Sequence, residues 1–180
     1  MRVNQIRDFV ISYLVNHLSK DDVVIDATIG NGHDTLLLSD LSKYVYGFDV
    51  QQQAIETTQE LLNDHQVSNY KLIHDSHENI LKYVKDFKAV IFNLGYLPNS
   101  NKEIKTNKDS TINALNSLVR VMKQDSFVII TCYPGHDEGF IESEAIMKFV
   151  SNLDNSFTTL KYTVLNKNKS PFVILIEKNR

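Results

Sequence analysis

The stretch at residues 23–35, Val-Val-Ile-Asp-Ala-Thr-Ile-Gly-Asn-Gly-His-Asp-Thr, decides the fold of this chain. It begins with three apolar β-branched residues, which are typical of a buried strand, and Asp26 ends that run. Gly30 and Gly32 follow in a loop where side chains would obstruct the close approach of a ligand. The last residues of the stretch can open a helix. A strand, a glycine loop and a helix in this order predict a nucleotide-binding corner, with the ligand outside the carboxyl end of the strand.

The spacing within this loop indicates which nucleotide it accepts. A dinucleotide-binding loop has three glycines, so that pyrophosphate can rest against backbone N–H groups. Here the spacing is Asp26-x-Thr28-x-Gly30-x-Gly32, and the loop contains no lysine or arginine that could meet a phosphate. An acidic residue before the loop suits a cationic ligand, and S-adenosylmethionine, with its ammonium and sulfonium groups, has the matching charge. The alternative is a glycine turn in an ordinary α/β protein.

Length and composition indicate a single globular domain over residues 1–180. Apolar content is 42% and charged content 23%, both ordinary for such a domain. No apolar run approaches the roughly 20 residues that cross a bilayer, and the N-terminus lacks a secretory pattern, so no membrane partner is expected. The single cysteine, Cys132, excludes an internal disulfide and fits a reducing cytoplasm, which is the expected location.

The net charge of −3 gives no support to nucleic-acid binding by the chain as a whole. Binding of that kind requires a local patch, and the alternative is a set of solvated surface lysines. The candidate patches are Lys102, Lys105 and Lys108, and, further along, Lys161, Lys167, Lys169 and Arg180.

Hydrophobic periodicity predicts alternating strands and helices followed by a hairpin. Strands are expected at residues 22–26, 44–49, 70–73, 87–93 and 126–131, with a final antiparallel pair at about 157–165 and 171–177. Helices are expected at 3–18, 33–41, 51–66, around 80–81, from Ser110 or Thr111 to about 122, and at 137–153. Residues 94–109 form a long connection, which suggests a functional loop. The predicted fold is α/β and Rossmann-like: a mostly parallel seven-stranded sheet with a C-terminal antiparallel hairpin and helices on both faces.

The polar candidates fall at the carboxyl ends of the predicted strands, where a ligand crevice forms in such a sheet. Asp49 ends the second strand, 23 residues after Asp26. A carboxylate at this distance usually accepts hydrogen bonds from ribose hydroxyls, and Gln51 is close enough to add a polar contact. The alternative for Asp49 is a helix cap.

Asp75, Ser76 and His77 follow the third predicted strand. A carboxylate or hydroxyl at this point can accept the exocyclic amine of adenine. The alternative for Ser76 is to cap the next helix.

Asn93 and Tyr96 follow the central strand in Asn-Leu-Gly-Tyr-Leu-Pro. An amide oxygen and a nearby backbone carbonyl can accept the two hydrogens of an amino group, which orients the nitrogen lone pair at an electrophile. Tyr96 offers a stacking face for a planar base. This arrangement suits amine methylation, and the alternative is a turn with Tyr96 as packing.

Tyr133 and His136 follow the fifth strand and complete the candidate site. Tyr133 can form a wall of the substrate pocket, and His136 can take a proton from the product ammonium, although a lone histidine is more often structural. Cys132 has no evident base or metal partner and is expected to be buried and inert. The histidines show no metal-ligand spacing, so no metal is expected.

Assembled in order, these residues resemble a class I S-adenosylmethionine-dependent methyltransferase. More narrowly, the chain resembles small bacterial proteins once called putative rRNA methylases, a group now associated with methylation of 5-aminomethyl-2-thiouridine at the tRNA wobble position. The resemblance spans almost the whole chain and is carried by five motifs. They are Asp-Ala-Thr-Ile-Gly-Asn-Gly-His-Asp-Thr at 26–35, Phe-Asp at 48–49, Asp-Ser-His at 75–77, Asn-Leu-Gly-Tyr-Leu-Pro at 93–98 and Tyr-Pro-Gly-His at 133–136.

The resemblance implies N-methylation of that uridine side chain, giving 5-methylaminomethyl-2-thiouridine, with S-adenosylmethionine as cofactor and the tRNA anticodon stem-loop as partner. The candidate cofactor residues are Asp26, Thr28, Gly30, Asn31, Gly32, Asp34, Asp49, Gln51, Asp75, Ser76, His77 and Asn93. The candidate catalytic residues are Asn93, Tyr96, Tyr133 and His136. The loop at 99–110 and its lysines would meet the RNA, and a homodimer would help a weakly charged enzyme to hold an RNA hairpin.

Two departures and several alternatives accompany this interpretation. Thr28 replaces the first glycine of the general methyltransferase loop, and Leu94 replaces a proline of the Asn-Pro-Pro-Tyr motif found in many amino-group methyltransferases. The alternatives within the fold are an rRNA or small-molecule amine methyltransferase. Those of another class are a non-catalytic nucleotide-binding protein or an NAD-dependent enzyme.

Overall fold

The computed structural model describes residues 5–95 and 108–179. Tyr96, Lys102, Lys105, Arg180 and most of the expected functional loop lie outside these residues.

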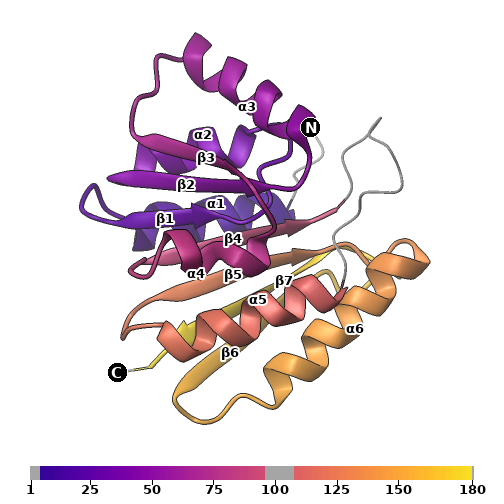
Figure 1. Ribbon diagram of the computed structural model, residues 1–180. Helices are drawn as coiled ribbons and strands as arrows, with labels where there is room; N and C mark the ends of the chain where they lie inside the picture. The colour runs from indigo at the N-terminus through magenta and orange to yellow at the C-terminus, as the bar shows by residue number, and fades with distance from the viewer. Residues whose placement is uncertain (1–4, 96–107, 180) are drawn as a thin grey trace.

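A seven-stranded mixed sheet forms the centre of the molecule, in the order β3-β2-β1-β4-β5-β7-β6 (Figure 1). Its strands are β1 (Val23–Asp26), β2 (Tyr44–Asp49), β3 (Tyr70–His74), β4 (Ala89–Leu94), β5 (Phe127–Cys132), β6 (Phe157–Thr163) and β7 (Phe172–Lys178). The first five strands are parallel, and β7 runs antiparallel to both β5 and β6. The predicted Rossmann-like sheet and its C-terminal antiparallel hairpin are confirmed.

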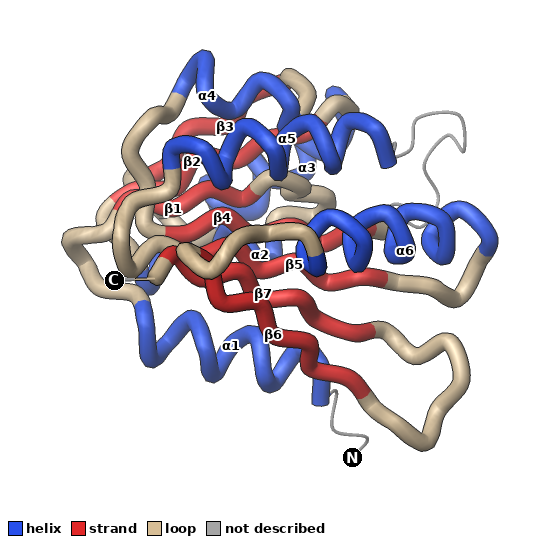
Figure 2. The backbone as a smooth tube through the Cα atoms, turned by 90° about the horizontal axis from the view of Figure 1, so that it is seen from below, coloured by secondary structure: helices blue, strands red, loops and turns tan. Residues whose placement is uncertain are grey.

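Helices cover both faces of the sheet, as predicted. On one face, α1 (Gln5–His17) and α2 (His33–Leu41) pack on β1, β4, β5 and β7, and α3 (Gln52–Asp64) packs beside α2 on β2 and β3. On the other face lie α4 (Ile80–Tyr83), α5 (Lys108–Val121) and α6 (Asp137–Ser151). Figure 2 shows α1 on the side of the sheet opposite to α5 and α6. In the part of the chain that the structure describes, no helix is both long and apolar enough to cross a bilayer.

The predicted helix around 80–81 is present as the single turn of α4, which follows a 3₁₀ turn, η1 (His77–Asn79). One helix start differs from the prediction. Helix α5 is already helical at Lys108, before the expected start at Ser110 or Thr111. Thr111 therefore lies inside the helix, where its buried hydroxyl donates to Glu142 on α6 at 2.8 Å.

Alternation along β4 places its polar residue on a defined face of the sheet. Val90, Phe92 and Leu94 belong to the core beneath α4, α5 and α6, whereas Ala89 and Ile91 belong to the core beneath α1 and α2. Asn93 continues the second set, so its side chain lies on the α1 and α2 side, next to the glycine loop.

Candidate active site

A cavity of about 700 Å³ lies at the carboxyl ends of the parallel strands and extends beneath α1. This volume is in the range of small-molecule and cofactor sites. The predicted site residues that line it are Thr28, Gly30, Asn31, Asp34, Asp49, Gln51, Asp75, Ser76, His77, Asn93, Tyr133 and His136. Of the other predicted residues, Asp26 and Gly32 do not line the cavity, and Tyr96 lies outside the described residues.

Gly32 shapes the loop after β1 through packing. Its backbone has φ of +80°, and its N–H donates to the Ile29 carbonyl at 2.8 Å. A Cβ atom here would lie 2.8 Å from Thr58 on α3, so the absent side chain allows the loop to rest on that helix. The expectation that Gly32 makes room for a ligand is therefore replaced by close packing against α3. Gly30, with φ of +52°, is the loop glycine that lines the cavity.

Asp26 supports the loop from below and does not line the cavity. It is 1% exposed, and its carboxylate accepts hydrogen bonds from the Thr28 N–H at 3.2 Å and the Thr35 hydroxyl at 2.6 Å. Burial, and then the charge of Asp34, raise the pKa of Asp26 to about 7. The sequence interpretation made Asp26 the carboxylate for a cationic ligand, but the carboxylate after β1 that faces the cavity is Asp34.

Asp49 joins the loops that follow β1 and β2. One carboxylate oxygen accepts from the Gly30 N–H at 3.1 Å and the other from the Gln51 N–H at 3.0 Å. Burial raises the pKa of Asp49, and its backbone hydrogen bonds oppose that rise. Gln51, not Asp49, is the N-cap position of α3. The structure thus places Asp49 on the cavity wall, not in the alternative role of a helix cap.

The loop after β3 contains one acceptor without a partner. Asp75 accepts from the Ser76 N–H, Asn79 and Tyr83, and Ser76 caps η1 by accepting from the Glu78 N–H at 3.3 Å. His77 is 7% exposed, and its Nε2 has no hydrogen-bond partner. A buried nitrogen that borders a cavity in this way is available to a ligand.

His77 is held as a neutral ring. Burial lowers its pKa to about 4, although a hydrogen bond to the backbone of Ala27 acts in the opposite direction. The ring also meets Phe92 edge-on, with centroids 5.4 Å apart. A neutral imidazole that donates through its other nitrogen presents a lone pair at Nε2, so His77 can accept a hydrogen bond inside the cavity.

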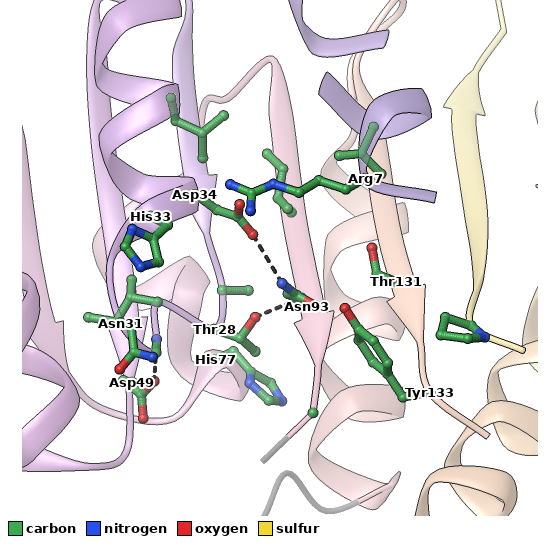
Figure 3. Close-up of a pocket in the computed structure, with 18 of the residues that line it drawn as sticks. Arg7, Thr28, Asn31, His33, Asp34, Asp49, His77, Asn93, Thr131 and Tyr133 are labelled. Atoms are coloured by element: carbon green, nitrogen blue, oxygen red, sulfur yellow. Dashed lines mark hydrogen bonds between the residues drawn. The ribbon is translucent and has the colours of Figure 1, made fainter. Parts of the chain in front are cut away.

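Asn93 is held at two atoms by the segment that follows β1 (Figure 3). Its backbone N–H donates to the Thr28 hydroxyl at 2.7 Å, and its side-chain Nδ2 donates to Asp34 at 3.1 Å. The first of these bonds gives a reason for threonine at position 28, where the general methyltransferase loop has a glycine. The Thr28 hydroxyl extends the pairing between β1 and β4 by one residue. Sequence reasoning identified Thr28, Asp34 and Asn93 without showing that they bond to one another.

The opposite wall of the cavity contains groups that the sequence did not reveal. Tyr133 follows β5, and burial and the charge of Asp34 raise its pKa, whereas Arg7 lowers it. Arg7 extends from α1 toward Asp34 (Figure 3). Arg7 belonged to the polar side of an ordinary amphipathic helix and gave no functional signal. The other lining residues that were not proposed for the site include His33, Ser110, Thr131 and Pro171, together with Lys169, which had been noted only as part of a lysine patch.

His136 is the N-cap residue of α6. Its Nδ1 accepts from the Gly139 N–H at 3.0 Å, and a Cβ on Gly139 would lie 2.2 Å from the Tyr133 carbonyl oxygen. Because Nδ1 is an acceptor, the neutral ring carries its hydrogen on Nε2. This tautomer can donate into the cavity but cannot take up a proton without losing the cap, which argues against the expected role of His136 as proton acceptor.

Cys132 is buried, and burial raises its pKa to about 12, so it is a thiol. Its predicted burial is confirmed. Within residues 5–95 and 108–179, no three His, Cys, Asp or Glu side chains gather as a metal ion would require.

The residues of the cavity fit S-adenosylmethionine. The unpaired Nε2 of His77 offers an acceptor to adenosine, whose amine and hydroxyl groups are donors. The carboxylate of Asp49 lines the same cavity and offers further acceptor oxygens to the cofactor's hydroxyl and ammonium groups. Gly30 lines the same edge of the cavity with φ of +52°, a conformation that glycine adopts without a steric penalty.

This sheet order, loop and cavity define a Rossmann-like methyltransferase that takes S-adenosylmethionine as methyl donor. Residues 45–178 match the family described as "Putative rRNA methylase". The chain belongs to this family.

Three similar proteins support the assignment. The chain is 34% identical over 177 residues to the Arabidopsis thaliana "tRNA (mnm(5)s(2)U34)-methyltransferase, chloroplastic", a match that covers 89% of this chain and 65% of that protein. A putative rRNA methylase from Clostridium thermocellum superposes with a TM-score of 0.92 at 34% identity, over 99% of this chain and 100% of the other. A putative methyltransferase from Streptococcus mutans in complex with SAH gives a TM-score of 0.90 at 38% identity, over 98% and 99% of the two chains.

Proposed function

We propose that this chain methylates tRNA, transferring a methyl group to the primary amine of 5-aminomethyl-2-thiouridine at wobble position 34 to give 5-methylaminomethyl-2-thiouridine. The observation that carries the proposal is Asn93 at the end of β4, on the cavity wall, with its amide nitrogen occupied by Asp34. Its amide oxygen is thereby left as an acceptor for an amine N–H. The name of the Arabidopsis thaliana relative supports the same substrate.

The residues that follow β2 and β3 are proposed to bind the cofactor. S-adenosylmethionine supplies an electrophilic methyl group on a sulfonium. Asp49 and Gln51 would hold its ribose, and the loop after β3, with His77, would accept hydrogen bonds from its adenosine. Asp26 and Gly32 act beneath this surface, where they fix the shape of the loop.

The reaction is a direct displacement in which the residues orient the amine. The new bond joins the amine nitrogen to the methyl carbon, the carbon–sulfur bond breaks, and its electron pair stays on sulfur. One proton then leaves the resulting ammonium. Asn93 accepts one amine hydrogen and so directs the nitrogen lone pair toward the methyl carbon, a contribution of orientation that can lower the barrier by several kcal/mol. Because Nε2 of His136 is a donor, the departing proton is assigned to solvent.

The base and the RNA would meet the outer part of the cavity. Tyr133 lies on its wall, and Tyr96 remains a proposed stacking partner that lies outside the described residues. Lys169 lines the cavity from the β6–β7 connection, and Lys108 begins α5, the helix whose residue Ser110 lines the cavity. These cations would attract the phosphates of the anticodon stem-loop. A homodimer and a cytoplasmic location stay predictions.

The test is methylation of a defined tRNA. The purified chain is incubated with S-adenosylmethionine and tRNA that carries 5-aminomethyl-2-thiouridine, and the nucleosides are analysed by mass spectrometry. We expect 5-methylaminomethyl-2-thiouridine to form with the wild type and not with Asn93→Ala, and tRNA without the aminomethyl group to stay unmodified. Methylation of rRNA or free amines alone would refute the substrate assignment. In calorimetric titration, binding of NAD without binding of S-adenosylmethionine would refute the reaction.

A further inference from the structure

Asn93 is anchored more firmly than a residue at the end of a strand usually is. Its main chain is tied to the Thr28 hydroxyl at 2.7 Å and its side chain to Asp34 at 3.1 Å. Both partners belong to the segment between β1 and α2, so one rigid unit sets the position and the rotation of the Asn93 amide.

The chemistry of Asp34 decides which way the amide points. An ionised carboxylate has only acceptor oxygens, so it bonds to the Nδ2 of an asparagine and not to its Oδ1. The amide is planar, and its oxygen therefore faces away from Asp34. In Figure 3 this side of Asn93 is the one toward Thr131 and Tyr133.

We propose that Asp34 is a positioning residue that fixes the Asn93 amide with its oxygen toward the nucleophile, and so makes the site specific for a nucleophile that carries N–H donors. Without Asp34 the amide can rotate by half a turn and present Nδ2, which repels an amine hydrogen. The inference rests on the proposed function, and it replaces a direct contact with the cofactor, which was the role expected for Asp34.

The neighbours of Asp34 fit this assignment. Its charge raises the pKa of Asp26 from beneath the loop and of Tyr133 from across the cavity, so it is near both. Arg7 reaches toward it from α1 (Figure 3). Asp34 is half-buried at the first turn of α2, where a carboxylate is also stabilised by the helix dipole. These surroundings hold the Asp34 carboxylate in a fixed place beside Asn93.

The experiment compares Asp34→Ala, Asn93→Ala and the double variant, at saturating tRNA and S-adenosylmethionine. If Asp34 acts through Asn93, Asp34→Ala lowers kcat about tenfold or more, and the double variant is no slower than Asn93→Ala. Asp34→Asn, whose carbonyl can still accept from Nδ2, falls between the wild type and Asp34→Ala. Asp40→Ala, which removes an exposed carboxylate from the same helix, leaves kcat unchanged.

Measuring cofactor binding shows whether Asp34 positions Asn93 or contacts the cofactor itself. We expect the Kd for SAH of Asp34→Ala, measured by calorimetry, to stay within about threefold of the wild-type value, which corresponds to less than 1 kcal/mol. Two results would overturn the inference: activity that returns to the wild-type level as S-adenosylmethionine is raised, or losses in the two single variants that multiply in the double variant.

NMR tests the inference without an activity assay, so the test remains valid if the proposed substrate is wrong. The side-chain amide signals of Asn93 in a ¹⁵N NMR spectrum are assigned by their absence in Asn93→Ala. A wild type that binds SAH but does not methylate the tRNA would reject the proposed function alone. The inference about Asp34 would then stand if Asp34→Ala shifts the Asn93 amide signals while Asp40→Ala does not, and it would fail if neither variant moves them.

Discussion

Replacing Thr28 by valine tests whether a single hydroxyl holds the end of β4 to the loop that follows β1. Valine keeps the shape of threonine but cannot accept a hydrogen bond. In the structure the Ala27 N–H donates to the Ile91 carbonyl at 2.8 Å, and the next pairing between these segments is the bond from the Asn93 N–H to the Thr28 hydroxyl. Thr28→Val leaves that N–H without its acceptor.

The size of the effect follows from the cost of an unpaired donor. Leaving a buried N–H unsatisfied costs about 1–3 kcal/mol. Thr28 is only half-buried, so we expect a loss of about 1–2 kcal/mol in the free energy of unfolding. For a chain of this size that corresponds to a fall in Tm of roughly 2–8 °C. Thr28→Ser keeps the hydroxyl and should lose less.

Urea unfolding is the assay, because an unchanged slope with a lowered midpoint identifies a change in stability. Turnover of the aminomethyl tRNA is measured in parallel and should fall in Thr28→Val, since Asn93 loses its main-chain anchor. The reasoning is refuted if Thr28→Val is as stable as the wild type, or if Thr28→Ser is the less stable of the two variants.

Three further predictions concern single side chains. Asn93→Ala should lower kcat by at least about tenfold with little change in the Kd for S-adenosylmethionine, whereas Asp49→Ala should weaken cofactor binding in calorimetry; a reversed pattern would contradict both roles. Between about pH 4 and pH 6.5, the lowered pKa of His77 makes the protein lose stability as pH falls, and the raised pKa of Asp26 makes it lose stability as pH rises. In Asp26→Asn the effect of Asp26 is removed, so the change in stability from about pH 4.5 to about pH 6.5, measured by urea unfolding, should be more favourable than in the wild type by about 2 kcal/mol. His136→Asn keeps a capping side chain and should retain turnover within about twofold, while His136→Ala should lose about 1 kcal/mol of stability in the same assay; a large loss of turnover in His136→Asn alone would restore the proton-acceptor role.

The fold could be predicted because its determinants are local. Short β-branched runs alternate with amphipathic segments, and parallel strands joined by helices give one sheet topology with the ligand at the carboxyl ends. This reasoning located the cavity and most of the polar residues that line it. It also gave the hairpin, because the polar connector at 166–170 separates two apolar runs.

The sequence could not show which site residues line the cavity and which support the loop from beneath, because this depends on the direction in which each side chain points. Asp26 and Asp34 are both carboxylates beside the same loop, and only the burial of Asp26 under Thr28 and Thr35 distinguishes them. Arg7 lies in the site because α1 crosses over β4 and β5, a tertiary contact that has no trace in its own sequence. The cap at His136 could have been found, because it stands immediately before a helix whose third residue is Gly139.

At the end of β1, two side chains replace one backbone hydrogen bond of the parallel sheet. A regular parallel ladder would continue with the Asn93 N–H donating to the Ala27 carbonyl. Instead the N–H bonds to the Thr28 hydroxyl and the carbonyl side of Ala27 bonds to His77, so two side chains substitute for the missing rung. The pairing of the two strands therefore passes from main chain to side chains at the edge of the cavity, and both main-chain groups keep a hydrogen-bond partner there.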